Sequence, residues 1–144
     1  MKAVIQRVTD ASVTVEKKTV SSIEHGLLVY LGITGTDTEQ EAAKMAEKIV
    51  HLRIFDDENG VPNRSVLDVN GKVLLVSQFT LYADASHGRR PSYIKAAPSE
   101  TAEPLYLTAL KEIRRYVPAE CGVFGANMKI ASVNDGPFTI LLEI

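Results

Sequence analysis

The sequence has 144 residues, of which 45% are hydrophobic and 24% charged, and its formal net charge is −2. These values predict a single soluble domain that buries its own core without a disulfide or a structural metal. They argue against a protein that coats duplex nucleic acid, because such domains are strongly basic. The one cysteine, Cys121, has no partner for an internal disulfide and fits a reducing, cytoplasmic setting.

The first part of the chain predicts β-structure. Residues 2–9 and 12–17 alternate apolar and polar side chains and are rich in Val, Ile and Thr, and 19–23 and 26–33 are predicted as the next two strands. The N-terminal segment is therefore predicted as a strand and not as a signal peptide. The longest apolar run, within 26–33, is too short to span a bilayer.

The next segment changes from strand to helix periodicity. Apolar residues recur at helical spacing at Ala42, Met45, Ala46, Ile49 and Leu52. Thr38 and Glu41 have the spacing of a capping box, so a helix is predicted from about Glu39 to Leu52. The turn-rich DDENGVPN that follows predicts a small surface hairpin.

A buried strand and a long loop come next. Residues Val73 to Leu81 predict a strand, and the apolar run Val73-Leu74-Leu75-Val76 predicts burial on both of its faces. Residues 82–98 contain Gly, Pro, Ser and basic residues without a periodic pattern, which predicts a loop. Loops of that length are typically functional or disordered.

The C-terminal part predicts a second helix from near Ser99 to Tyr116, in which Pro104 is tolerable only near the first turn. Three short β-segments close the chain, at 122–126, 128–134 and 138–143. The stretch NDGPFT between the last two has the turn chemistry of a hairpin, although Pro137 removes a backbone donor there.

These elements predict an α+β fold class. A mainly antiparallel β-sheet or barrel carries two helices packed on it, in a single domain spanning 1–144. No internal repeat or linker divides the chain.

Familiar catalytic motifs are absent: the sequence has no Gly-x-Ser-x-Gly elbow, Walker loop, His-Glu-x-x-His or Cys-x-x-Cys. The three histidines, His25, His51 and His87, fall in different predicted elements and are more typical of polar surface or capping residues than of a catalytic base. The acidic run at 56–58 favours a solvated turn over a metal site, because adjacent side chains on a tight hairpin seldom converge. No metal or other cofactor is predicted.

One polar stretch follows the most buried predicted strand. Ser77-Gln78-Phe79-Thr80-Leu81 brings two hydroxyls, an amide and an aromatic ring. A central strand that becomes polar at its carboxyl end often opens into a pocket. The alternative is a plain strand with alternating faces, in which Phe79 points inward and the hydroxyls outward.

A small basic patch is the second candidate site. Gly88-Arg89-Arg90-Pro91, with Lys95 close by, falls in the long predicted loop. Such a patch suits contact with one end of an RNA, and a solvated loop is the competing interpretation.

SQFTL at 77–81 together with NDGPFT at 134–139 resembles the D-aminoacyl-tRNA deacylases. AVIQRV, ASVTV, GLLVYLGI, KIVHLRIF, SVLDV, GRRPS, AEPLY and FGANM also resemble that family, in its order along the chain. The resemblance covers essentially the whole sequence. It implies hydrolysis of the ester that joins a D-amino acid to the terminal adenosine of a tRNA, by a two-fold homodimer that needs no cofactor.

The resemblance implies a catalytic group made of Ser77, Gln78, Phe79 and Thr80. The backbone N–H groups of Phe79 and Thr80 are expected to stabilise the oxyanion. No base is evident that would activate Thr80 as a nucleophile, so we expect it to position the substrate. In the family, the 2′-hydroxyl of the terminal ribose assists hydrolysis instead.

The resemblance also implies how handedness is tested. Gly136-Pro137 is expected to be a cis peptide whose carbonyl oxygens enter the pocket of the partner subunit and exclude an L side chain. Arg7 is expected to hold this segment in place, and Thr139 to form hydrogen bonds near it. Phe138 stands where Val is more usual in the family, so its bulk is expected to alter the pocket or the subunit contact.

Substrate contacts follow from the same resemblance. Met128 and Phe79 are expected to stack against the adenine, and Arg89, Arg90 and Lys95 to contact the tRNA. The Gly136-Pro137 carbonyl oxygens are expected to exclude a substrate by a clash with its side chain. Glycine has no side chain, so cleavage of glycyl-tRNA is predicted. Two other functions fit the residues: a module that only holds tRNA ends, and a hydrolase of small esters or amides centred on Thr80.

Overall fold

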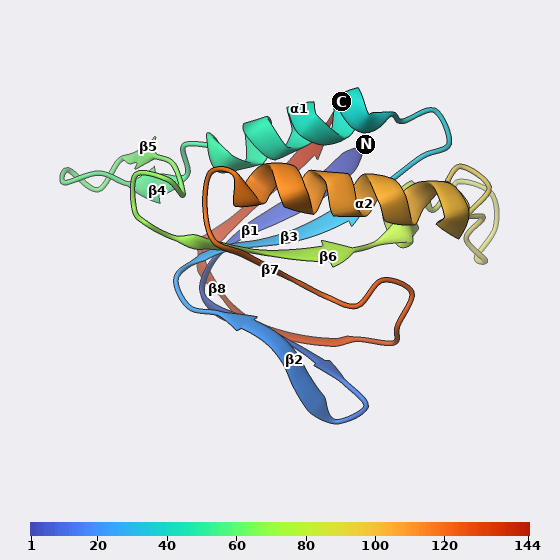
Figure 1. The fold of residues 1–144 in the computed structure, drawn as a ribbon, viewed down its shortest axis with the longest axis horizontal. Helices are drawn as coiled ribbons and strands as arrows, with labels where there is room; N and C mark the ends of the chain where they lie inside the picture. The colour runs from blue at the N-terminus through green and yellow to red at the C-terminus, as the bar shows by residue number, and fades with distance from the viewer.

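The computed structural model describes residues 1–144, and Figure 1 shows a curved sheet with both long helices on one face. The strands are β1 (Lys2–Val15), β2 (Lys18–Ile23), β3 (Gly26–Gly32), β4 (Phe55–Asp56), β5 (Pro62–Arg64), β6 (Lys72–Ser77), β7 (Ala119–Cys121) and β8 (Lys129–Glu143). The helices are α1 (Glu39–Val50), the short 3₁₀ helix η1 (Phe79–Tyr82) and α2 (Ser99–Arg114). The predicted α+β fold class is therefore confirmed. None of these helices combines the length and the apolar character needed to cross a membrane.

β1 organises the sheet. Its first half pairs with β3 and its second half with β2, while β8 runs along its other edge, and all three pairings are antiparallel. β6 pairs with β3, and β7 with β6, in parallel. The parallel pairs arise because α1 and α2 lie in crossover connections that return the chain to the same end of the sheet. β8 pairs with β1 alone, so its second edge is open.

The core lies on both sides of the central strands. Val73 and Leu75 of β6 pack in the large cluster between the sheet and the helices, and Leu74 and Val76 pack in a smaller cluster on the opposite face. All four side chains are at most 2% exposed. The predicted burial of this strand on both faces is confirmed, and such burial fixes its carboxyl end rigidly in the molecule.

Local sequence signals place α1 accurately. The Thr38 hydroxyl accepts from Gln40 N–H at 3.2 Å, and Glu41 accepts from Thr38 N–H at 2.9 Å, so the capping box is present. The helix ends at Val50, two residues before the predicted end. In α2, Pro104 is the sixth residue and lies beyond the first turn where it was expected.

The strand prediction is wrong at four places. The strands predicted at 2–9 and 12–17 are one strand, Lys2–Val15, and those predicted at 128–134 and 138–143 are one strand, Lys129–Glu143, so no hairpin turn occurs at NDGPFT. Residues 122–126 form no strand, and the strand predicted to reach Leu81 ends at Ser77. The two long strands support each other through pairing over most of their length, and this long-range pairing overrides the local turn signal.

Candidate active site

A cavity of about 620 Å³ opens where β6 ends, between the loop that leads into α2 and the loop that precedes β8. Four residues singled out from the sequence line it: Ser77, Gln78, Phe79 and Met128. Most of the other lining side chains are apolar. An apolar cavity with a few polar groups at one end is typical of sites for small organic groups.

Thr80, also predicted from the sequence, does not line this cavity itself, and its hydroxyl is held by Gln78, which does. The Gln78 backbone N–H donates to the Leu31 carbonyl at 2.8 Å, and its side-chain amide donates to the Thr80 hydroxyl. The hydroxyl has no hydrogen bond to a histidine or a carboxylate. Its contacts therefore suit a positioning role and supply no base to make it a nucleophile.

The first turn of η1 presents free backbone donors. Phe79 and Thr80 are its first two residues, so their N–H groups have no acceptor within the helix. Gln78 precedes them and provides no side-chain cap. Two adjacent N–H groups beside a cavity can stabilise a developing oxyanion.

Two exposed aromatic rings stand at the mouth of the cavity. Phe79 is 57% exposed and Tyr93 is 42% exposed, and their rings meet edge to face with centroids 5.1 Å apart. Both residues line the cavity. The sequence predicted a functional role for the long loop that carries Tyr93, but only for its basic residues. The signal that identifies Tyr93 is its contact with Phe79, which only the folded chain shows.

Met128 enters the cavity because Gly122 leaves room for it. A Cβ atom built on Gly122 would lie 2.5 Å from the Met128 sulfur. Gly122 is buried, and Met128 is half-buried in the cavity wall. A side chain at position 122 would therefore displace the thioether.

The NDGPFT segment forms a bulge in β8. Gln6 of β1 pairs with Thr139 and Val8 with Asn134, so the four residues 135–138 lie opposite the single residue Arg7. The Gly136-Pro137 peptide bond is cis, and both residues are exposed at the surface. Gly136 has φ +122°, and a Cβ there would lie 3.2 Å from the guanidinium of Arg7. Only glycine suits this position.

Asn134 and Thr139 close the base of the bulge. The Asn134 side chain accepts from the Phe138 N–H at 3.1 Å and donates to the Thr139 hydroxyl at 3.0 Å. Gln6 donates to the same hydroxyl at 3.3 Å. Asn134 was not assigned a role from the sequence, although Asn is a frequent residue in turns for this type of side-chain bond.

Arg7 fixes the bulge from beneath. Its side chain is 9% exposed, donates to the Asp135 carbonyl at 3.3 Å, and forms ion pairs of 3.2 Å with Asp56 and with the Asp135 carboxylate. It also donates to the Ile54 carbonyl at 2.9 Å, and its guanidinium lies 5.2 Å from the Phe138 ring centroid. The predicted contact between Arg7 and the Gly-Pro segment is present.

The structure separates these residues into two groups. Arg7, Gly136, Pro137 and Thr139 do not line the cavity of their own chain. The resemblance implies that Gly136 and Pro137 act at the site of a partner subunit, and within one chain they do not meet the cavity residues Ser77, Gln78 and Phe79.

The basic residues lie on a mostly exposed arm, residues 84–95, which also carries Tyr93. Arg89 and Arg90 are exposed at its tip, and Lys95 lies 3.4 Å from the Asp84 carboxylate. Hydrogen bonds from Ser86, from its hydroxyl first and then its backbone N–H, together with Lys95, lower the pKa of Asp84 to about 2. Asp84 and Ser92 also exchange two backbone hydrogen bonds of 2.8 and 2.9 Å, which close the arm at its base.

The other candidates from the sequence lie elsewhere. The rings of His25 and His51 pack against Phe55 and Tyr116, and neither histidine lines the cavity. No three side chains of His, Cys, Asp or Glu are grouped so that they could hold a metal ion.

Comparisons with known proteins agree on one family. Residues 4–143 match the family model described as D-Tyr-tRNA(Tyr) deacylase. The chain is 54% identical to the D-aminoacyl-tRNA deacylase of Thermosipho africanus, covering 99% of this chain and 97% of that protein. It is 52% identical to the D-aminoacyl-tRNA deacylase of Halalkalibacterium halodurans, covering 99% of each.

Solved structures share the fold over the full length. A structure titled c-Myc DNA Unwinding Element Binding Protein superposes with a TM-score of 0.95 at 45% identity, covering 100% of this chain and 99% of that one. A structure titled as a probable eukaryotic D-amino acid tRNA deacylase has the same fold at 17% identity, with a TM-score of 0.88 and coverage of 99% and 98%. With its family-model match and relatives above 50% identity along its whole length, the chain belongs to the D-aminoacyl-tRNA deacylase family.

Proposed function

We propose that this hydrolase cleaves the ester of D-aminoacyl-tRNA and of glycyl-tRNA and spares L-aminoacyl-tRNA. The observation that carries the proposal is the cavity at the end of β6, where the uncapped first turn of η1 meets an exposed aromatic pair. The aromatic pair suits a nucleobase and the free N–H groups suit an ester carbonyl. The 3′ end of an aminoacyl-tRNA offers both groups side by side.

Hydrolysis at this site needs little acid–base machinery. An aminoacyl ester is already activated by the protonated amine beside its carbonyl. Water adds to the carbonyl carbon while the N–H groups of Phe79 and Thr80 stabilise the oxyanion, each for about 10²–10³ in rate. The bond to the ribose oxygen then breaks, and this oxygen leaves with a proton as the free hydroxyl of the tRNA. The neighbouring 2′-hydroxyl of the substrate assists by orienting the water.

In this proposal the main-chain oxygens that exclude L side chains come from a second copy of the chain. Gly136 and Pro137 of the partner subunit place their main-chain oxygens at the mouth of the cavity. Two features support supply in trans: the bulge is at the surface, and it lies outside the cavity of its own chain. The open edge of β8 supports self-association, because Val133 and Leu141 on this strand are 54% and 65% exposed.

In this proposal the arm contacts the tRNA through its basic residues, Arg89, Arg90 and Lys95. Their exposure and their position next to Tyr93 support this role. Lys95 also pairs with Asp84, so the two arginines at the tip are the freer cations.

The test compares purified protein on D-Tyr-tRNA, L-Tyr-tRNA and Gly-tRNA, with release of the amino acid as the readout. We expect rapid cleavage of the first and third substrates and none of the second. Binding of tRNA without cleavage would favour a module that only holds tRNA ends. Equal cleavage of free D-tyrosine esters would favour a small-ester hydrolase.

A further inference from the structure

A second hollow adjoins the candidate active site. Its volume is about 400 Å³, and no hydrophobic residue lines it. The lining residues are Thr14, Glu16, Lys17, Asn127 and Lys129. Asn127 lines the catalytic cavity as well, so the two hollows share a wall. We call the second hollow the lysine groove.

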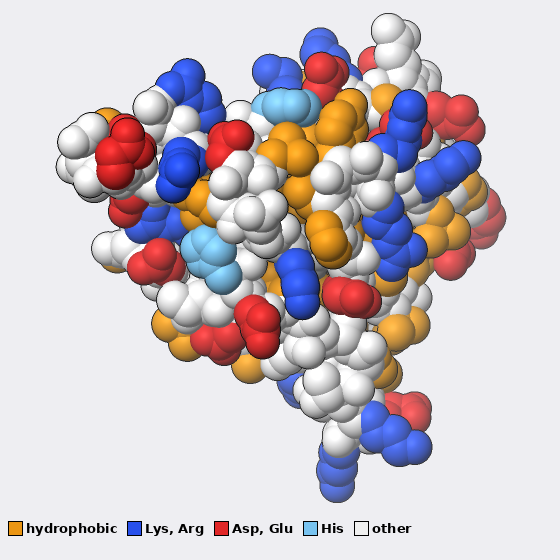
Figure 2. Space-filling view, turned by 60° about the vertical axis from the view of Figure 1, so that its left-hand side comes forward, with side chains coloured by type: hydrophobic (Ala, Val, Ile, Leu, Met, Phe, Trp, Pro, Cys, Tyr) orange, Lys and Arg blue, Asp and Glu red, His pale blue; other side chains and the backbone are white.

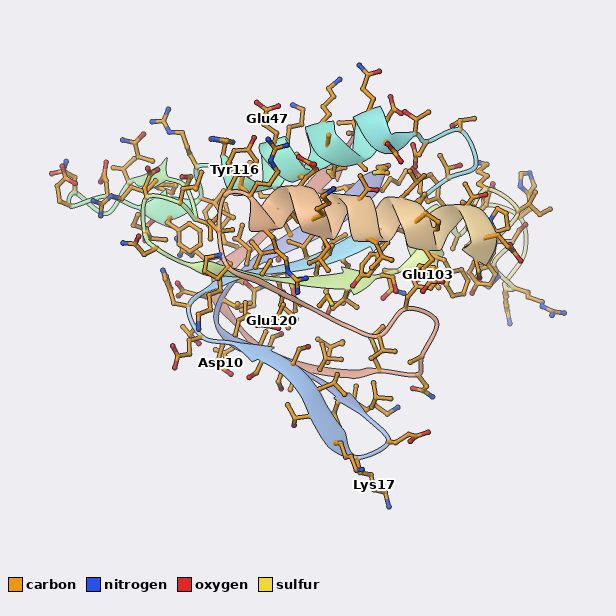
Figure 3. The ribbon with its side chains drawn as sticks, viewed as in Figure 1. Asp10, Lys17, Glu47, Glu103, Tyr116 and Glu120 are labelled. Atoms are coloured by element: carbon orange, nitrogen blue, oxygen red, sulfur yellow. The ribbon has the colours of Figure 1, made fainter.

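The fold brings the two lysines together from distant parts of the sequence. Lys129 opens β8 and pairs in register with Thr14 of β1. Lys17 belongs to the two-residue turn between β1 and β2, because Val15 pairs directly with Lys18. Figure 3 shows Lys17 at the tip of this hairpin, projecting away from the sheet.

The turn itself is unusual in sequence. Glu16 and Lys17 have φ values of +49° and +65°, in the left-handed region that glycine or asparagine normally occupies in such turns. The chain thus keeps two long charged side chains where a smaller residue is easier to accommodate. This places Lys17 at the rim of the groove, at the tip of the β1–β2 hairpin.

The groove carries unpaired positive charge. Neither Lys17 nor Lys129 takes part in an ion pair or a side-chain hydrogen bond, and Glu16 is the only carboxylate in the lining. We propose that the lysine groove binds the phosphates of the nucleotides that precede the terminal adenosine of the tRNA, while the adenosine and its ester occupy the neighbouring cavity. This inference rests on the proposed function.

The chemistry of the groove favours an RNA backbone. A hollow lined only by polar and charged residues, two of them lysines, suits phosphate oxygens, and it has no aromatic side chain on which a base could stack. The aromatic pair and the arginine arm lie beside the catalytic cavity, so the groove adds a separate sequence-independent contact. A strand leaving the cavity past Asn127 enters the groove directly.

The experiment removes the charges and keeps the fold. The double variant Lys17→Gln/Lys129→Gln is compared with the wild type on D-Tyr-tRNA and on 2′(3′)-O-D-tyrosyl-adenosine, which carries no phosphate. We expect kcat/KM on tRNA to fall roughly tenfold at low salt through a higher KM, with cleavage of the adenosine ester unchanged. The logarithmic dependence of tRNA binding on salt should become less steep by about 0.7 for each phosphate that a lysine no longer neutralises.

Lys44→Gln/Lys48→Gln is the matched control, because both lysines lie on the outer surface of α1, which packs on the opposite side of the sheet from the β1–β2 hairpin (Figure 1). An equal loss in this control would overturn the inference, since it would reflect total charge only. An equal loss on both substrates would also overturn it. If the groove variant dissociates into subunits by light scattering while the wild type does not, the groove is a contact between copies of the chain and the inference fails.

Failure of the proposed function is visible separately. If the wild type cleaves neither substrate, the proposed function fails whatever the variants do. The groove is then tested alone, by fluorescence anisotropy, with an RNA hairpin that ends in CCA and carries no amino acid. Unchanged affinity in the Lys17→Gln/Lys129→Gln variant would overturn the inference in that case too.

Discussion

The guanidinium of Arg7 holds Asp135 twice, through its backbone carbonyl at 3.3 Å and through its carboxylate at 3.2 Å. Asp135 directly precedes Gly136-Pro137, so one buried side chain on β1 fixes the position of the bulge on β8. Figure 2 shows charged side chains of both signs spread over the face of the molecule that it presents.

Arg7→Leu should destabilise the protein and relax its selectivity. The change leaves the Ile54 and Asp135 carbonyls and the Asp56 carboxylate without their donor, at a cost of about 2–3 kcal/mol in the free energy of unfolding. Urea unfolding measures this cost. The rate of cleavage of L-Tyr-tRNA measures the loss of selectivity when the Gly136-Pro137 segment is held less firmly. Arg7→Lys should be intermediate, because an ammonium lacks the planar fork.

The matched control for Arg7 is Arg115→Leu. Arg115 pairs with Glu112 at 2.8 Å, but its side chain is 69% exposed. Exposed pairs of this kind contribute less than about 1 kcal/mol. If both variants lose the same stability, Arg7 does not have the structural role described above.

Thr80→Ala should keep a substantial part of the activity. The Thr80 hydroxyl has only the Gln78 amide as a partner, and the proposed oxyanion donor is the backbone N–H, which alanine retains. We expect kcat to fall by less than about tenfold, because the backbone donors that supply the larger rate factors stay in place. Complete loss of activity with an unchanged circular dichroism spectrum would point to a covalent role instead.

Tyr93→Leu should raise KM and leave kcat nearly unchanged. Loss of an edge-to-face pair costs about 0.5–1.5 kcal/mol, which is roughly a two- to tenfold effect on substrate binding. Tyr93→Phe retains the ring and should behave as the wild type. Tyr116→Leu is the control, because Tyr116 is 44% exposed and packs against His51 on the helical face, far from the cavity (Figure 3). A fall in kcat alone would contradict this role for Tyr93.

Gly122→Ala should alter the site with little cost to the fold. The new methyl would overlap the Met128 sulfur, and a flexible thioether can move at small cost. We expect nearly unchanged thermal stability and a higher KM for D-Tyr-tRNA. Gly35→Ala is the control, since nothing lies within 4 Å of a Cβ there. A Gly122→Ala enzyme with wild-type kinetics would show that Met128 does not contact the substrate.

The arm should loosen only at very low pH. The pKa of Asp84 is about 2 in the folded chain, because of hydrogen bonds from Ser86, and about 3.9 when unfolded. A lowered folded pKa means that the stabilising carboxylate is fully present above about pH 4 and is lost as the pH falls through about 2. Proteolysis of the arm by pepsin should therefore accelerate between about pH 4 and 2. In Asp84→Asn the extra acceleration in this window should be absent; if it persists, another group controls the arm.

Local signals in the sequence predicted much of this fold. The Thr38–Glu41 capping box placed the start of α1, and the apolar run at 73–76 predicted a strand buried on both faces. Both features depend on residues within a few positions of each other. The polar end of that strand also identified Ser77 and Gln78 as residues of the cavity wall.

Long-range pairing decided what the local signals could not. The Asn-Asp-Gly turn chemistry fits a hairpin and a bulge equally well, and the choice depended on β1, which lies far earlier in the chain and pairs with both sides of the segment. The burial of Arg7 and the contact of Tyr93 with Phe79 depend on the same kind of distant approach.

Residue patterns alone were enough to identify the family, the two long helices and the buried strand that ends at the site. The folded chain was needed to show that NDGPFT is a bulge outside its own cavity, and that Lys17 and Lys129 share a groove beside that cavity. The physical reason is that capping and periodicity act over one or two turns of the chain, whereas strand register is set by the summed pairing and packing of segments far apart in sequence.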